Sequence, residues 1–329
     1  MRELTIQKND ADQRLDRFLG KAVPLLPASL AQKYIRLKRI KVNGARAERD
    51  YRLCEGDRLQ LYLNDEFFEA PSEENVYLTI VNPRLHIIYE DENIMLLDKP
   101  AGMVVHADEG EKVNTLVNHL LAYLYQKREW KPREENAFTP ALCNRIDRNT
   151  GGIVIAAKNA EALRVLNEKI RERELSKFYL CICLGRPEPP KGRIECFLRK
   201  DSKTNTVRVY HHPVPDGRSA VTLYETLETR DRLSLVEVEL LTGRTHQIRA
   251  SFADMGHPLL GDGKYGVGSV NRRYGETQQA LYSYRLRFDF PTDAGILNYL
   301  RGREFIADEV PFRRKYFGLS LIHISEPTR

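Results

Sequence analysis

The chain of 329 residues is long enough for two domains that each bury a core. Hydrophobic residues make up 42% and charged residues 30%, and no apolar run approaches the length of a membrane span, so we expect a globular protein without membrane contact. The start of the chain has no signal-peptide core, which predicts a cytoplasmic location. The net charge of +6 favours a polyanionic partner only weakly, because many basic proteins bind no nucleic acid.

Metal and nucleotide chemistry are not indicated. The five cysteines are odd in number and form no C-x-x-C pair, and the histidines form no cluster with them. The glycine patterns of Walker A and Rossmann motifs are also missing. We therefore predict no metal and no cofactor, so that side chains alone would carry any chemistry.

The first 65 residues predict a compact module of two helices and a small sheet. Residues 12–22 and 28–37 have helical apolar spacing, and we expect Asp12 to cap the first helix. Strands are predicted at 40–42 and 59–63, beside turns at 43–44 and 56–57. The expected apolar stripes are Leu15, Phe18, Leu19 and Ala22 in the first helix, and Leu30, Tyr34 and Leu37 in the second.

A basic cluster lies on and just after the second helix. It consists of Lys33, Arg36, Lys38 and Arg39. Charge alone favours a solvated helix face, but residues 12–63 resemble the S4 RNA-binding domain. The resemblance is carried by Arg14-Leu-Asp16-Arg17-Phe-Leu, Ile35-Arg36, Val42-Asn43-Gly44 and Leu53-x-x-Gly56-Asp57. It implies that the four basic residues contact RNA phosphates, which give affinity rather than sequence choice.

The composition changes after the first module. Residues 66–84 are acidic and turn-rich, and we interpret them as a linker to a second domain at 85–318. That domain should begin with strands at 86–89 and 94–97 and a helix at 114–125. We expect Lys99 to have a structural role at a strand end rather than to contact phosphate. Trp130, in a polar loop at 127–138, is expected to be a partly exposed aromatic residue.

The most informative stretch is Leu142-Cys-Asn-Arg-Ile-Asp-Arg-Asn-Thr-Gly-Gly-Ile-Val-Ile-Ala156. It places Asp147 between Arg145 and Arg148, ahead of a turn and a buried strand. A carboxylate flanked by guanidinium groups should stay ionised, which suits nucleophilic attack or proton abstraction better than acid catalysis. By spacing alone, a structural ion pair is the more frequent role of such an aspartate.

Two later segments add polar side chains near a strand and a helix. Lys177 and Tyr179 begin a predicted strand that follows a helix at 160–174. The octet Thr242-Gly-Arg-Thr-His-Gln-Ile-Arg249 follows a predicted strand at 234–241 and leads into a helix that we expect Thr245 to cap. A helix N-terminus beside two arginines forms an anion site.

Together these segments resemble the RluA-type RNA pseudouridine synthases. The family motif His-Arg-Leu-Asp-Arg-Asp-Thr-Ser-Gly is matched by Arg145-x-Asp147-Arg148-x-Thr150-x-Gly152, with Asn144, Ile146, Asn149 and Gly151 as departures. Lys177-x-Tyr179, the octet at 242–249 and Gly261-Asp262-x-x-Tyr265-Gly266 continue the match. The resemblance implies an α+β fold, with an S4-like domain at 1–65 and a catalytic domain whose mixed, mostly antiparallel sheet is flanked by helices.

The resemblance also implies an activity, the isomerisation of uridine to pseudouridine in RNA, by analogy in 23S ribosomal RNA of the large subunit. Asp147 would act as a nucleophile or as a base, and the sequence leaves both routes open. Arg249 would pair with Asp147, and Tyr179 would stack on the base and help to remove its C5 proton. A monomer is expected. The alternative is an inactive S4-bearing RNA-binding or ribosome-assembly factor, against which the intact catalytic residues argue.

Five further residues are expected to bind the substrate. They are Arg145, Lys177, Arg244, His246 and Gln247. Arg145 would grip a phosphate or replace the extruded base, and a salt bridge within its loop is the alternative. Residues 319–329 lack a family counterpart, and their last nine residues resemble translated adapter read-through, so we expect a disordered, non-native tail.

Overall fold

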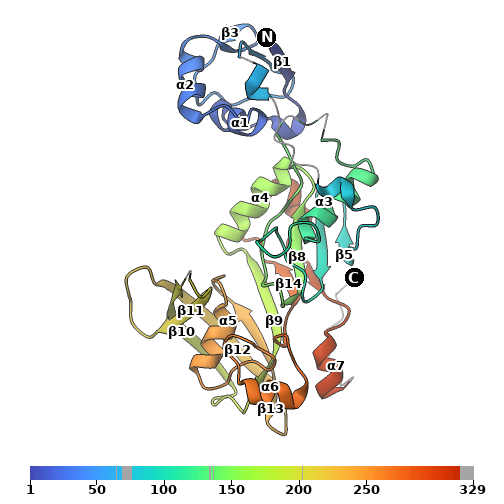
Figure 1. Ribbon diagram of the computed structural model, residues 1–329, viewed down its shortest axis with the longest axis vertical. Coiled ribbons are helices and arrows are strands. Elements are labelled where there is room, and N and C mark those ends of the chain that lie inside the picture. Colours follow the sequence, from blue (N-terminus) through green and yellow to red (C-terminus); the bar gives the residue numbers. More distant parts are fainter. Residues whose placement is uncertain (64, 69–75, 133–134, 136, 202, 319–329) are drawn as a thin grey trace. The chain divides into compact units, whose positions relative to one another are not determined.

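A computed structural model describes residues 1–63, 65–68, 76–132, 135, 137–201 and 203–318 (Figure 1). The expected linker lies partly outside the described residues, and the expected non-native tail lies wholly outside them. The chain forms two compact units. The first contains residues 1–84, 117–141 and 157–164, and the second contains residues 85–116, 142–156 and the chain from 165 onward. The domain boundaries at 65 and 85 stay predictions.

The helices and strands follow one another in chain order. Up to residue 84 they are β1 (Arg2–Thr5), η1 (Lys8–Asp10), α1 (Leu15–Ala22), α2 (Ala28–Arg36), β2 (Ile40–Val42), β3 (Ala45–Arg46), β4 (Arg58–Leu61), η2 (Asp65–Phe68) and η3 (Val76–Thr79). They continue with β5 (Ile87–Glu90), β6 (Ile94–Lys99), α3 (Leu116–Gln126), β7 (Ala141–Leu142), β8 (Gly151–Ala157), α4 (Ala160–Arg171), β9 (Leu175–Leu184), β10 (Lys191–Asp201), β11 (Thr206–Tyr210), β12 (Arg218–Arg230), β13 (Leu233–Leu240), α5 (Gln247–Asp254), α6 (Gly268–Tyr274), β14 (Leu281–Phe288), η4 (Gly295–Leu300), β15 (Glu304–Ile306) and α7 (Pro311–Phe317).

The first unit contains the predicted module of two helices on a small sheet. Its strands pair in the order β1-β4-β2-β3, and α1 and α2 lie beside them in Figure 1. Leu15, Phe18 and Leu19 of α1 are buried in one core with the inward residues of β2 and β4. Burial of these apolar side chains is what holds such a short sheet together, since an isolated hairpin is only marginally stable in water.

Three local expectations for this unit were wrong. Helix α1 begins at Leu15, and Asp12 lies before it with a positive φ of 59° instead of capping it. In α2 the expected Leu30 and Tyr34 do pack against the core beside the buried Ala31 and Ile35, but Leu37 lies beyond the end of the helix at Arg36 and is 56% exposed. Trp130 is only 6% exposed, and its ring lies 5.2 Å from that of Tyr77.

The second unit is built on a large sheet. Among the described residues its strands run in the order β11-β10-β12-β13-β9-β14-β8-β6-β5, with β15 beside β14 and β7 beside β8. β14 and β8 pair in parallel, while the pairs from β11 to β14 are antiparallel. The expected α+β class with a mixed, mostly antiparallel sheet is confirmed.

Strand β9 lies in the middle of this sheet and divides the core into two layers. Tyr179, Cys181 and Cys183 pack on one side with Ile248 and Phe252 of α5. The residues between them, Leu180 and Ile182, pack on the other side with residues of α7 and β14. This alternation is the period of two expected for a strand, and it places Tyr179 on the same side of the sheet as α5.

Candidate active site

Asp147 lies in the loop that joins β7 to β8. The N–H of Thr150 donates to the carbonyl oxygen of Asp147 at 3.1 Å, which closes a turn around the carboxylate. The base of the loop is held by Asn144, whose Oδ1 accepts the N–H of Ile155 at 2.7 Å. Asn144 stands where the family motif has His, and its role in this chain is this backbone contact.

Glycines allow this loop to reach the sheet. Gly152 has a φ of +109° and pairs with Ser283 of the parallel strand β14. A Cβ at Gly152 would lie 2.1 Å from the Ser283 carbonyl oxygen, so only glycine fits. A Cβ at Gly151 would lie 2.4 Å from Cε2 of Tyr282, whose hydroxyl donates to Asp98 at 2.6 Å. The glycine at 151, where the family has Ser, therefore makes room for the tyrosine ring.

Lys99 holds the Asp147 loop through hydrogen bonds to backbone carbonyl oxygens. It is fully buried, and its Nζ donates to the carbonyl oxygens of Pro100, Met103 and Arg148 at 2.9, 2.7 and 2.9 Å. The structural role expected for Lys99 is confirmed. Arg148, for which the sequence predicted no role, forms an ion pair with Asp108 in which Nη2 lies 2.9 and 2.8 Å from the two carboxylate oxygens.

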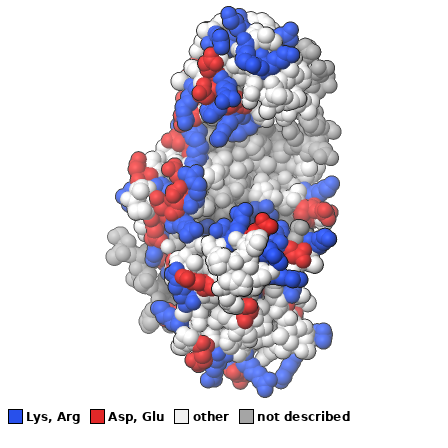
Figure 2. Space-filling view, turned by 90° about the vertical axis from the view of Figure 1, so that its left-hand side faces the viewer, with Lys and Arg blue, Asp and Glu red and all other residues white. Residues whose placement is uncertain are grey.

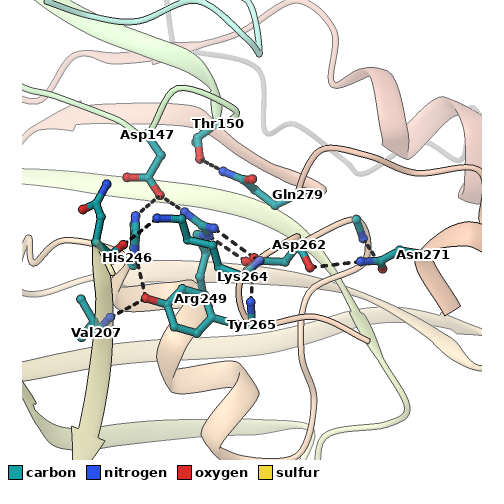
Figure 3. Close-up of polar contacts among 12 residues, drawn as sticks. Asp147, Thr150, Val207, His246, Arg249, Asp262, Lys264, Tyr265, Asn271 and Gln279 are labelled. Atoms are coloured by element: carbon teal, nitrogen blue, oxygen red, sulfur yellow. Dashed lines mark hydrogen bonds and ion pairs between the residues drawn. The ribbon is translucent and has the colours of Figure 1, made fainter. Parts of the chain in front are cut away.

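The ion pair expected between Arg249 and Asp147 is present. Nη1 of Arg249 lies 2.7 Å from Oδ2 of Asp147 (Figure 3). On its other edge the same guanidinium donates to both oxygens of Asp262, from Nε at 2.7 Å and from Nη2 at 3.0 Å. A two-point contact of this kind fixes the plane of the guanidinium group, so Asp262 determines where Arg249 points.

The pair of Arg249 and Asp262 is buried and charged. Arg249 is 5% and Asp262 is 1% exposed. Burial alone would raise the pKa of Asp262, but hydrogen bonds from Arg249 and from the backbone N–H groups of Tyr265 and Lys264 outweigh it and lower the pKa. Burial would lower the pKa of Arg249, but Asp262 and Asp147 outweigh it and raise that pKa. Both groups therefore stay charged at neutral pH.

His246 lies on the other side of Asp147. It precedes α5 with a left-handed φ of 52° and occupies the N-cap position that we expected for Thr245. Its Nδ1 lies 2.8 Å from the hydroxyl of Tyr265, which accepts the N–H of Val207 (Figure 3). Its Nε2 lies 3.8 Å from Oδ2 of Asp147. Burial lowers the pKa of His246 against the opposing charge of Asp147, which favours a neutral ring.

Tyr179 lies on β9, on the side of the sheet that carries α5. It is 6% exposed, and burial and the charge of Asp147 raise the pKa of its phenol to about 12, against the opposing effect of the Ser283 hydroxyl. The phenol is therefore protonated at neutral pH. Lys177, two residues earlier, is half-buried, its side chain forms no hydrogen bond or ion pair with the described residues, and burial lowers its pKa.

Two of the arginines expected to bind substrate differ in how they are held. Arg145 is exposed and forms no ion pair with any residue that the structure describes, so the salt-bridge alternative is wrong. Nε of Arg244 donates to the carbonyl oxygen of Ser219 at 3.1 Å. Burial, and then the charges of Arg218 and Arg173, lower the pKa of Arg244. Arg244, Arg218 and Arg173 are thus close enough to influence one another, and none of the three forms an ion pair with a residue that the structure describes, as a site for a polyanion requires.

Gln247 does not fit the expected substrate contact. Its side chain is 2% exposed, and its oxygen accepts from Thr242 Oγ1 and from the N–H of Arg244. Its nitrogen donates to the Val221 carbonyl and to Thr222 Oγ1. With both polar atoms satisfied inside the protein, Gln247 positions the octet loop on β12 instead of facing a ligand.

The basic cluster of the first unit is available to a ligand. Lys33, Arg36, Lys38 and Arg39 are all exposed, and none forms an ion pair within the described ranges. The guanidinium carbon of Arg39 lies 5.2 Å from the ring centroid of Tyr34.

Sequence reasoning gave no role to Asp262 and Tyr265, which hold Arg249 and His246. The signal was present in Gly261-Asp262-x-x-Tyr265-Gly266, which matched the family motif without indicating what these side chains touch.

No group of three or more metal-ligating side chains is found among the described residues. Within the same residues, no helix has the length and apolar character needed to span a membrane.

Comparisons with known proteins identify the family of the chain. The family model for RNA pseudouridylate synthase matches residues 93–254, and that for the S4 domain matches residues 13–59. A protein of Mycoplasma genitalium named uncharacterized RNA pseudouridine synthase is 33% identical over 286 residues, which cover 86% of this chain and 88% of that protein. Ribosomal large subunit pseudouridine synthase C of Vibrio parahaemolyticus is 30% identical, with 88% of each chain covered.

The fold is also similar to a solved structure. Human RNA Pseudouridylate Synthase Domain Containing 1 aligns with a TM-score of 0.56 and 22% identity, over 75% of this chain and 88% of that chain. At this identity the similarity concerns the fold. With the family match and the similarity to relatives along most of the sequence, the chain belongs to the RNA pseudouridine synthases, enzymes that isomerise uridine in RNA, and it carries an S4 domain ahead of the catalytic fold.

Proposed function

We propose that Asp147 is the catalytic carboxylate of this pseudouridine synthase. The observation that carries the proposal is the contact of 2.7 Å between the Asp147 carboxylate and Arg249, whose guanidinium is already engaged by Asp262. Asp262 already balances the positive charge of Arg249. The arginine can therefore orient Asp147 without cancelling the negative charge of its carboxylate. Its side chain is 27% exposed, so one face remains open to a substrate.

The reaction is redox-neutral. The N1–C1′ bond breaks, the detached uracil turns, C5 joins C1′, and the C5 proton is lost while N1 gains one. Asp147 would either attack C1′ or remove the proton at C2′ to give a glycal. Uridine carrying deuterium at C2′ separates these routes, since a primary isotope effect on the rate is expected only if that C–H bond breaks.

The surrounding residues would bind and orient the nucleotide. We assign Tyr179 to stacking and hydrogen bonding with the base, since a phenol with a pKa of about 12 is a poor proton acceptor at neutral pH. His246 would remain neutral, with its Nε2 beside the carboxylate of Asp147. Arg145, Lys177 and Arg244 would contact the RNA backbone, and Arg145 would also fill the space of an extruded base.

The target that we propose is large-subunit ribosomal RNA. A relative that is 30% identical is named for the ribosomal large subunit. The S4 domain fits the same substrate, because the basic cluster on α2 would bind phosphates of a structured RNA. A monomer acting in the cytoplasm is part of this proposal.

The test uses RNA transcribed with [5-³H]uridine. The wild type should release tritium from large-subunit RNA faster than from small-subunit RNA, and Asp147→Ala should release none while still binding. If the wild type binds both RNAs and releases no label from either, the protein is the inactive S4-bearing factor instead. Equal release from both RNAs would overturn the proposed target and leave the catalytic assignment intact.

A further inference from the structure

The small sheet of the first unit has an outward face that lies beside the basic cluster of Lys33, Arg36, Lys38 and Arg39, called here the α2 cluster. Residues paired directly across antiparallel strands share a face. The register pairs Glu3 with Gln60, Gln60 with Lys41, and Lys41 with Arg46. The residues between them, Leu59, Leu61, Ile40 and Val42, are buried in the core. The row from Glu3 to Arg46 therefore lies on the side of the sheet that faces away from the helices.

An exposed aromatic ring lies on this outward face. Tyr62 comes two residues after Gln60, and its N–H donates to the carbonyl oxygen of Arg39 at 2.8 Å, which extends the pairing of β4 with β2. Its side chain is on the outward face by the alternation of the strand and is 42% exposed. Nζ of Lys41 lies 5.5 Å from the centroid of the ring. This is a cation–π arrangement at the surface.

The charges around this ring are mainly positive. Lys41 and Arg58 form no ion pair with any of the described residues, and Arg46 is paired with Glu48 at 3.0 Å. Glu3 is the one acidic residue in the row. Figure 2 looks at the side of the first unit on which α2 lies in Figure 1, and there Lys and Arg side chains are prominent among a few Asp and Glu side chains. An exposed aromatic ring beside one unpaired cation, with a second unpaired cation further along the same strand, is an arrangement that can bind single-stranded nucleic acid, with a base on the ring and phosphates on the cations.

We propose that Tyr62, Lys41 and Arg58 form a second RNA-binding surface, the sheet platform, which holds one unpaired nucleotide. The base stacks on Tyr62, and the neighbouring phosphates contact Lys41 and Arg58. The faces of bases inside a duplex are already stacked, so Tyr62 can be used only where a nucleotide is unpaired or extruded. The platform thus gives the S4 domain a preference for unpaired nucleotides, whereas the α2 cluster provides affinity for any RNA strand.

Binding measurements on the full chain with Asp147→Ala test this proposal, because this background holds RNA without converting it. The probes are a short fluorescent single-stranded RNA and a blunt duplex of the same length. Adding Tyr62→Ala should weaken binding to the single strand about tenfold, leave duplex binding unchanged, and not alter the dependence on salt. Tyr62→Phe keeps the ring and should bind like the parent. Lys41→Gln should weaken binding to the single strand more than to the duplex and reduce the salt slope on the single strand by about 0.7.

The control is Tyr299→Ala, which removes an equally exposed tyrosine (42%) of the second unit and should change neither affinity. The proposal is overturned if Tyr62→Ala binds the single strand as tightly as the parent, or if it loses as much affinity for the duplex. These outcomes do not depend on tritium release, so the sheet platform and the catalytic role of Asp147 can fail separately.

Discussion

Replacing Asp262 by Asn should destabilise the protein more than replacing Asp147, although Asp147 is the proposed catalyst. Asp262 is 1% exposed and accepts two hydrogen bonds from Arg249, which is itself 5% exposed. Removing one partner of a buried ion pair leaves the other charge uncompensated and costs about 3–5 kcal/mol. Asp147→Asn removes one contact at a partly exposed side chain and leaves the Asp262 pair intact, so it should cost about 1 kcal/mol or less.

The assay is urea unfolding of the wild type and of the two variants, followed by circular dichroism. The structure predicts that Asp262→Asn lowers the free energy of unfolding by about 3 kcal/mol or more, with an unchanged dependence on urea. RNA isomerisation by this variant, measured where it is still folded, should also fall, because Arg249 loses its orientation. Equal stability of Asp262→Asn and the wild type, or a larger loss in Asp147→Asn, would refute the assignment of Asp262 as the residue that holds Arg249.

Three further outcomes are expected. Gly152→Ala should lower the free energy of unfolding by at least about 3 kcal/mol, since its Cβ would meet the Ser283 backbone, whereas Gly243→Ala, with open space around it, should stay near the wild type in the same urea titration. The phenol of Tyr179 titrates near 10 in the unfolded chain and about 12 in the folded one, so its contribution to stability is constant below pH 10 and falls by about 1.4 kcal/mol per pH unit from pH 10 to 12. Above pH 10, the free energy of unfolding of the wild type should therefore fall relative to that of Tyr179→Phe. A difference between the two proteins that stays constant with pH would contradict the pKa shift. Replacing the four residues of the α2 cluster by Gln should reduce the salt slope of duplex RNA binding by about 0.9 for each phosphate that these side chains neutralise, and an unchanged slope would remove the cluster from the binding surface.

Local sequence patterns predicted the elements whose structure depends on neighbouring residues. The apolar spacing of α1, the turn at Gly44 and the strand that begins at Lys177 and Tyr179 follow from rules that act within a few residues. The pairing of Asp147 with Arg249 was also predicted, but only through the family motif, because 102 residues separate the two partners.

What the sequence did not reveal depends on the three-dimensional surroundings. Gln247 looked like a substrate ligand because it is polar and lies in the motif, yet its hydrogen bonds are satisfied by β12 and by its own loop. Trp130 lies in a polar stretch, yet it packs against Tyr77 from a distant part of the chain. Asp262 could be recognised as part of a motif, but its contact with Arg249 appears only when the loop after α5 folds back.

Asp147 is proposed to perform the chemistry and not merely to support the fold. The most direct measurement is the single-turnover rate of tritium release by Asp147→Asn, together with its affinity for the same RNA. The expected rate for Asp147→Asn is at least about 10³-fold below that of the wild type, with binding and folding nearly unchanged. A rate close to the wild type in a folded, RNA-binding Asp147→Asn protein would contradict it.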